Sequence, residues 1–167
     1  MTLDELNQLP QADVLKALLG CCHSQRWTES MARARPFASE QQLLERADEA
    51  WAEASESDIL EAFSGHPRIG DMDLLRSRYA GRAMTEQGQL LESEESVIRE
   101  LHQLNVDYEK RHGFIFIVCA SGKTAEQMLS LIKARIGRSR DAELAQGARE
   151  QGAITRLRLI NLLTEEE

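Results

Sequence analysis

Apolar residues recur at helical spacing along much of this 167-residue chain, and this repetition constrains the fold more than any other feature. The clearest example runs from Ser93 to Arg111, where Glu, Arg and Lys fill the positions between the apolar ones. The apolar stripe consists of Val97, Leu101, Leu104 and Tyr108. An α-helix brings residues at this spacing to one face, so the stretch predicts a helix packed against a core.

Signals for the beginning and end of further helices are frequent. Three hydroxyl residues are followed three positions later by Glu or Gln, a pattern typical of a helix N-terminus: Thr2/Glu5, Ser39/Gln42 and Thr124/Gln127. Apolar stripes predict helices over Asp13–Cys22, with Leu19 facing inward, and over Ser39–Ala54, Thr124–Ile136 and about Asp141–Leu163. In the last of these, the residues expected to face inward are Ile154, Leu157 and Ile160. Gly113 and Gly137 follow two predicted C-termini.

These segments define the predicted fold class. Six or more helices with at most one strand-like segment predict an all-α protein, a single-domain helical bundle over residues 1–167. The run from Phe114 to Ala120 is too short to classify by its period, and its apolar character predicts burial. Two regions, Ser24–Ala38 and Ser64–Thr85, are predicted to be irregular. Long ordered loops in a compact domain are often functional, so we expect the active site there.

Charge and composition exclude several classes of protein. The formal net charge of −8 opposes binding to nucleic acid or to an anionic membrane surface. No apolar run approaches the ~20 residues that span a membrane, and the acidic start of the sequence does not resemble a signal peptide. The three cysteines, an odd number with two adjacent, leave at least one thiol unpaired. We therefore expect a cytoplasmic protein without nucleic-acid or membrane partners.

Three further patterns in the sequence could indicate a nucleotide, anion or metal site. The run before Ser121–Thr124 resembles a phosphate-binding loop, but Ile117 occupies a position that requires glycine, so no nucleotide site is predicted. The amides at this helix start either receive an oxyanion or are simply capped. The basic stretch Lys133–Arg140 either attracts a small anion or forms a solvated helix end. The four histidines lack metal-ligand spacing, so no metal is predicted: His23, His66, His102 and His112.

His66 differs from the other histidines because of its neighbours in SGHPRIGD. Gly65 is expected to let the backbone bend, while Pro67 biases His66 away from helical angles. A histidine held in this way is either a proton donor and acceptor or a cap on the preceding helix. Downstream, Thr85–Gly88 places the carboxylate of Glu86 beside an amide. His102 and His112, in contrast, are expected on a solvated helix face.

Four motifs taken together carry a family resemblance. HPRIGD at 66–71, TEQG at 85–88, YEKRHGFIFIVCASGKT at 108–124 and RLRLINLL near the end stand in a characteristic order. The chain resembles the decarboxylases of 2-oxo-4-hydroxy-4-carboxy-5-ureidoimidazoline (OHCU), which complete the conversion of urate to allantoin. The resemblance covers nearly the whole chain, and it implies an all-helical homodimer that acts on a small ureidoimidazoline without metal or organic cofactor.

The resemblance also implies roles for particular residues. His66 and Glu86 are the expected catalytic pair, with Gln87 as an amide that orients the substrate. Arg158 is the expected substrate-binding arginine, although Arg156 remains an alternative. The other expected substrate-binding residues are Pro67, Ala83, Met84, Thr85, Ile117, Val118, Cys119, Ala120 and Ser121. Family members often carry a serine at the position of Ala83, so that hydroxyl contact is either lost or supplied by Thr85.

The implied reaction can be derived from the substrate, which can itself accept the electron pair left by carbon dioxide. His66 is expected to transfer a proton, and backbone amides at residues 117–121 to stabilise developing charge. Glu86 either orients the His66 ring or holds the ureido group. Two alternatives remain: a helical interaction module whose SGHPRIGD loop docks a partner protein, and an inactive relative that only binds a purine breakdown product.

Overall fold

The computed structural model describes residues 1–66, 88–120 and 122–164, and side chains in 88–94 are not included. These residues form helices and contain no strand, which confirms the predicted all-α class. The helices are α1 (Leu3–Gln8), α2 (Gln11–Leu19), α3 (Gln25–Arg33), α4 (Glu40–Ala52), α5 (Glu56–Ser64), α7 (Gly88–His112), α8 (Ala125–Arg135) and α9 (Arg140–Thr164). None of the described helices is both long and apolar enough to cross a membrane.

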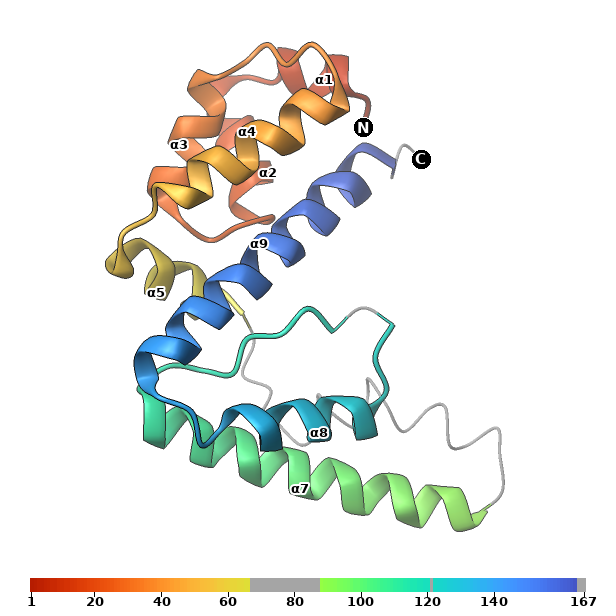
Figure 1. The fold of residues 1–167 in the computed structure, drawn as a ribbon. Helices are drawn as coiled ribbons and strands as arrows, with labels where there is room; N and C mark the ends of the chain where they lie inside the picture. Colours follow the sequence, from red (N-terminus) through yellow and green to blue (C-terminus); the bar gives the residue numbers. More distant parts are fainter. Residues whose placement is uncertain (67–87, 121, 165–167) are drawn as a thin grey trace. The chain divides into compact units, whose positions relative to one another are not determined.

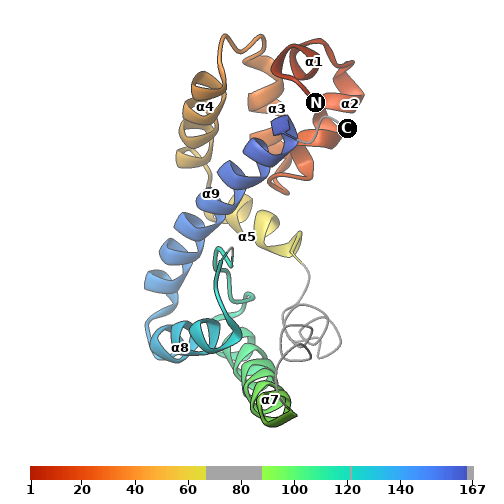
Figure 2. The same ribbon diagram turned by 90° about the vertical axis from the view of Figure 1, so that its right-hand side faces the viewer.

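The described chain divides into two compact units (Figure 1). Unit 1 comprises residues 1–66 and 148–164, which hold α1 to α5 and most of α9. Its core is a cluster of buried side chains from these helices: Leu6, Val14, Leu18, Cys21, Cys22, Trp27, Met31, Ala32, Phe37, Leu43, Ala47, Ala50, Ala62 and Leu159. Within unit 1, α9 runs beside α4 (Figure 2), where Trp51 Nε1 donates to the carbonyl of Ala148 at 2.8 Å.

Unit 2 comprises the described residues of 88–147. Here α7 and α8 pack side by side in both views, and Tyr108 and Phe116 meet edge to face with ring centroids 5.2 Å apart. The helix α7 ends at His112 as predicted, because Gly113 adopts φ +83°, a left-handed conformation that costs glycine little. The chain then continues without regular structure through Phe114–Ala120, of which Phe114, Phe116, Ile117 and Val118 are buried.

Several caps agree with the sequence. Thr2/Glu5 and Thr124/Gln127 form the two reciprocal hydrogen bonds of a capping box. Ser39 accepts from the N–H of Gln42, but the Gln42 side chain accepts instead from Ala38 N. Each cap satisfies N–H groups that the first helical turn leaves without a partner.

Four local predictions are wrong. The region Ser24–Ala38 is irregular only in residues 34–38, because Ser24 caps α3 and α3 buries Trp27 and Met31. Leu19 is 37% exposed, since α2 ends there and the stripe continues through Cys22 instead. In α9 the fully buried apolar residue is Leu159, whereas the residues expected inward are only half-buried: Ile154, Leu157 and Ile160.

The fourth wrong prediction concerns His112, which is 2% exposed rather than solvated. Its ring lies 4.4 Å from the Tyr108 ring, and its Nε2–H donates to the carbonyl of Ile136 at 3.1 Å. The bond to the end of α8 satisfies Nε2, whereas Nδ1 is buried without a hydrogen-bond partner among the described residues.

The structure explains the glycine at position 65 by steric space rather than by the predicted backbone bend. Its φ of −79° and ψ of −9° are open to any residue, so the bend does not require glycine. A Cβ at this position would instead collide with Cβ of His23, which follows α2. The close approach of the His23 side chain in unit 1 therefore selects glycine here, immediately before His66.

We expect Gly65→Ala to lower the free energy of unfolding by about 1–3 kcal/mol, the usual cost of overpacking. Urea denaturation would measure it. His23→Gly removes the Cβ that Gly65→Ala meets, so the double variant should recover much of the loss relative to His23→Gly alone. Equal losses with His23 and with Gly at position 23 would contradict the steric explanation.

Candidate functional site

His66 stands directly after the end of α5. Gly65 N and His66 N continue the last turn by donating to the carbonyls of Ala62 and Phe63 at 3.2 and 3.1 Å. The half-buried ring of His66 turns to α9, where its Nε2 lies 2.5 Å from Oε1 of Gln151. His66 is therefore held both by backbone and by its ring.

The contact with Gln151 continues into a row of buried polar groups in unit 1. Gln151 is fully buried, and its Nε2 donates to Oγ1 of Thr155, one turn later on α9, at 3.1 Å. Thr155 is itself buried, with 3% of its surface exposed. Gln151 and Thr155 are thus used to hold His66 rather than to fill an apolar core.

The thiols beside this row are not prepared to act as nucleophiles. Burial raises the pKa of Cys22 to about 12 and that of Cys21 to about 11. Because the thiolate is the reactive form, both cysteines stay protonated and inert near neutral pH.

The surroundings of His66 favour its uncharged form. Burial is the main cause that lowers the pKa of His66, and the positive charge of Arg158 and the ring of His23 add to it. The hydrogen bond to Gln151 acts in the opposite direction, but the net pKa is below the ordinary value of 6.5. His66 can therefore accept a proton at neutral pH.

The two candidate arginines have different partners. Arg156 forms an ion pair with Asp48 of α4 at 2.6 Å. Arg158, which is partly exposed like Arg156, makes a long 3.5 Å contact from Nη1 to the carbonyl of Gly20, and its charge contributes to the lowered pKa of His66. These contacts favour Arg158 as the arginine that serves the His66 site.

In unit 2, the candidate binding segment Ile117–Ala120 is held through its carbonyl groups. Arg135 Nη1 donates to the carbonyl of Ile117 at 2.9 Å, and Lys123 Nζ donates to that of Cys119 at 2.7 Å. In a planar trans peptide, the N–H points away from the C=O. The N–H groups of Val118 and Ala120 therefore point away from these cations, which also polarise both peptides toward stronger donation.

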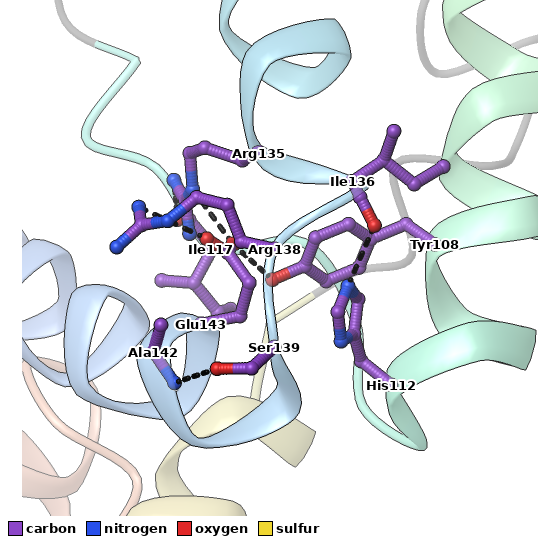
Figure 3. Close-up of polar contacts among 9 residues, drawn as sticks. All are labelled: Tyr108, His112, Ile117, Arg135, Ile136, Arg138, Ser139, Ala142 and Glu143. Atoms are coloured by element: carbon purple, nitrogen blue, oxygen red, sulfur yellow. Dashed lines mark hydrogen bonds and ion pairs between the residues drawn. The ribbon is translucent and has the colours of Figure 1, made fainter.

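Arg135 is itself fixed by a buried cluster, shown in Figure 3. Glu143 is fully buried, and its Oε1 receives Arg135 Nε at 2.8 Å and the Tyr108 hydroxyl at 2.6 Å. Arg138 pairs with the other oxygen at 3.1 Å, and the Arg135 guanidinium lies 4.5 Å from the centre of the Phe116 ring. Burial and the adjacent Glu143 raise the pKa of Tyr108 far above its ordinary value, so it remains a donor.

This cluster changes the interpretation of the basic stretch Lys133–Arg140. Arg135 and Arg138 pair with Glu143, and Lys133 pairs with Glu100 at 2.9 Å. Lys133, Arg135 and Arg138 are therefore engaged in ion pairs within unit 2, so these three residues form neither a simple solvated helix end nor an open anion site.

Of the site residues predicted from the sequence, the structure describes His66, Arg158 and Ile117–Ala120. It places the first two together in unit 1 and the segment in unit 2. The remaining predicted residues lie outside the described part of the chain: Pro67, Ala83, Met84, Thr85, Glu86, Gln87 and Ser121. Among the described residues, no group of His, Cys, Asp and Glu is arranged to hold a metal ion.

Four residues that the structure places at these sites were not predicted from the sequence: Gln151, Thr155, Arg135 and Glu143. Gln151 and Thr155 give one detectable signal, because they are polar residues four apart in line with Leu159 on one helix face. Arg135 and Glu143 give none, since charged residues eight apart across a turn are common on surfaces.

An uncharged, half-buried histidine that is held by its backbone and its ring is suited to proton transfer, so the site is of the acid–base class. Comparison with known proteins narrows this class: the model of the OHCU decarboxylase family matches residues 7–160, and the chain belongs to this family. Relatives include the "Uric acid degradation bifunctional protein TTL" of Arabidopsis thaliana, 36% identical over 148 residues, covering 87% of this chain and 46% of the relative. A Haloferax volcanii "2-oxo-4-hydroxy-4-carboxy-5-ureidoimidazoline decarboxylase" is 24% identical over 168 residues, covering 99% of this chain and 98% of the relative.

The fold is also similar to that of solved structures. The crystal structure of an OHCU decarboxylase in the presence of (S)-allantoin has a TM-score of 0.72 and 34% identity, covering 88% of this chain and 96% of that one. An (S)-allantoin synthase with 18% identity and a TM-score of 0.71 shares the fold over 96% of this chain and 54% of its own. The chain spans less than half the length of the bifunctional relatives, at 46% of the Arabidopsis protein and 33% of PucL of Bacillus subtilis.

Proposed function

We propose that this chain decarboxylates OHCU to (S)-allantoin, the last step from urate to allantoin, with no cofactor. The observation that carries the proposal is His66, uncharged and anchored, in the HPRIGD motif of a chain that the family model matches over residues 7–160. The presence of (S)-allantoin with a 34% identical OHCU decarboxylase supports the same product.

The reaction follows from the chemistry of the substrate. The C–C bond to the carboxylate breaks, carbon dioxide leaves, and the electron pair enters the ring, where a ring nitrogen takes up a proton. The hydroxyl group loses its proton and becomes the carbonyl of allantoin. A proton is added to the carbon that bears the ureido group, and its delivery to one face gives one enantiomer.

The residues divide this work among them. His66 removes the hydroxyl proton or delivers a proton to carbon, and Glu86 orients His66 or holds the ureido group. Arg158 binds the negatively charged substrate. Backbone donors of residues 117–121 stabilise charge that develops on substrate oxygens, supported by the polarised peptides that precede Val118 and Ala120. Gln87, Pro67, Ala83, Met84 and Thr85 complete the binding site.

The first experiment generates OHCU from urate with urate oxidase and hydroxyisourate hydrolase, adds this protein and follows circular dichroism. We expect (S)-allantoin to appear as a single enantiomer faster than by spontaneous decay. Racemic product at the spontaneous rate would contradict the proposed activity.

We expect Arg158→Gln to raise KM about 10- to 100-fold, because the variant loses a charge-assisted hydrogen bond to an anionic substrate. Arg156→Gln is the matched control on the same helix, and it should change KM by less than about twofold because an exposed ion pair contributes little. Steady-state kinetics would measure both, and equal effects would refute the assignment to Arg158.

The resemblance supports three further proposals: residues 1–167 act as one domain, the protein is a homodimer, and it is cytoplasmic. The family match extends through residues of both units, which supports the first. Light scattering in solution tests the second, and cell fractionation tests the third.

A further inference from the structure

The side chain that contacts the His66 ring is an amide, and an amide can either donate or accept. Gln151 Oε1 lies 2.5 Å from His66 Nε2. If the oxygen faces the ring, Nε2 must carry the proton, whereas a facing NH₂ group would require an unprotonated Nε2. The orientation of Gln151 therefore decides which nitrogen of a neutral His66 is the base.

The other end of Gln151 fixes this orientation. Its Nε2 donates to Thr155 Oγ1 at 3.1 Å, one turn further along α9. With the NH₂ group engaged by Thr155, the amide presents its oxygen to the His66 ring. Gln151 and Thr155 are each at most 3% exposed, so water does not compete for these groups.

We propose that Gln151 is a positioning residue that holds His66 with the proton on Nε2 and leaves Nδ1 as the nitrogen that exchanges a proton with the substrate. The inference rests on the proposed function for the identity of the substrate. The buried pair of Gln151 and Thr155 then orients the ring, because the hydroxyl engages the amide nitrogen and the amide oxygen engages His66 Nε2.

The charges around the ring are compatible with this arrangement. Arg158 of α9 and His23, which follows α2, both disfavour a protonated ring, so the resting imidazole is neutral and has a single N–H. A neutral imidazole needs one acceptor, and Gln151 supplies it.

The first test reads the tautomer in the whole, substrate-free protein. Long-range ¹H–¹⁵N correlation spectra distinguish protonated from unprotonated ring nitrogens, and His66→Asn assigns the signals. We expect Nε2–H to predominate in the wild type above the His66 pKa. A predominant Nδ1–H form would overturn the proposal, and because no substrate is used, this result is independent of the decarboxylase activity.

The second test uses variants at position 151. Gln151→Leu removes the acceptor, so we expect mixed tautomers and a kcat about 10- to 100-fold lower with little change in KM. Gln151→Glu keeps an acceptor, so it should retain the Nε2–H form and shift the acidic limb of the pH profile of kcat/KM upward. Gln103→Leu is the control, because Gln103 is an exposed glutamine bonded to Asp107 on α7.

The outcomes separate the two proposals. Unchanged tautomer and kcat in Gln151→Leu would refute the positioning role while leaving the decarboxylase in place. Nε2–H in the wild type, lost in Gln151→Leu, without turnover of OHCU in any variant would refute the function and keep the positioning role. Thr155→Val, which removes the partner of the amide, provides the same comparison if Gln151→Leu does not fold.

Discussion

Replacing His66 with Ala or Asn is expected to lower kcat by a factor of about 10² to 10⁴, the usual contribution of a positioned acid–base group. His66→Asn is the sharper variant, because asparagine retains an N–H that can donate to Gln151 but cannot exchange protons near neutral pH. The circular dichroism assay on enzymatically generated OHCU measures the loss, and far-UV spectra verify that the helices persist. Turnover at the wild-type rate in either variant would exclude His66 from the chemistry.

The same residue gives a pH dependence with a defined sign. Burial lowers the pKa of His66 below 6.5, so the base form is available at neutral pH and the acidic limb of kcat/KM lies below that value. The pKa of His66 is lower in the folded protein than in the unfolded chain. The contribution of His66 to the free energy of unfolding is therefore fully present above the unfolded-state pKa and is lost as the pH falls through the folded-state pKa. A limb above pH 6.5 that disappears in His66→Asn would contradict this environment.

The largest stability effect is expected in unit 2, from Glu143→Ala. The substitution leaves the Arg135 guanidinium buried without its carboxylate and removes the acceptor of the Tyr108 hydroxyl. Breaking a buried pair in this way costs about 3–5 kcal/mol. Urea denaturation measures the loss, and Glu143→Gln, which keeps an oxygen for Tyr108, should lose less.

The matched control is Glu100→Ala, which breaks an ion pair of the same unit at the surface. Glu100 and Lys133 are each about half exposed, at 49% and 51%, so we expect a loss below about 1 kcal/mol. Equal destabilisation by Glu100→Ala and Glu143→Ala would contradict the expectation that burial makes the Glu143 cluster the larger contributor to stability.

Much of the fold follows from local sequence. The stop at His112 and Gly113 and the limits of α8 depend on caps and glycine conformation, which neighbouring residues determine, and both predictions are confirmed. The stripe from Ser93 to Arg111 also indicates its helix correctly, although Ile98 is more deeply buried than Val97. Hydrophobic periodicity locates a helix more reliably than it locates the buried line along it.

Tertiary contacts explain what the sequence did not predict. The sequence predicts His112 on the surface, whereas its contact with the carbonyl at the end of α8 places it in the interior. Gly65 has an ordinary conformation, and only the position of His23 shows why a side chain does not fit. The role of Gln151 likewise depends on its contact with His66, which is 85 residues away in the sequence. The roles of Glu86 and of the other residues outside the described part stay predictions.

The distribution of aromatic residues separates the two units spectroscopically. The tryptophans of the chain are Trp27 and Trp51, both in unit 1, where their indole N–H groups bond to the carbonyls of Ala47 and Ala148. The stretch 67–147 contains no tryptophan and holds both tyrosines of the chain. Tryptophan emission, excited selectively at long wavelength, therefore reports on unit 1 alone. The unlabelled wild-type protein thus carries its own probe for whether the two units melt as one or separately.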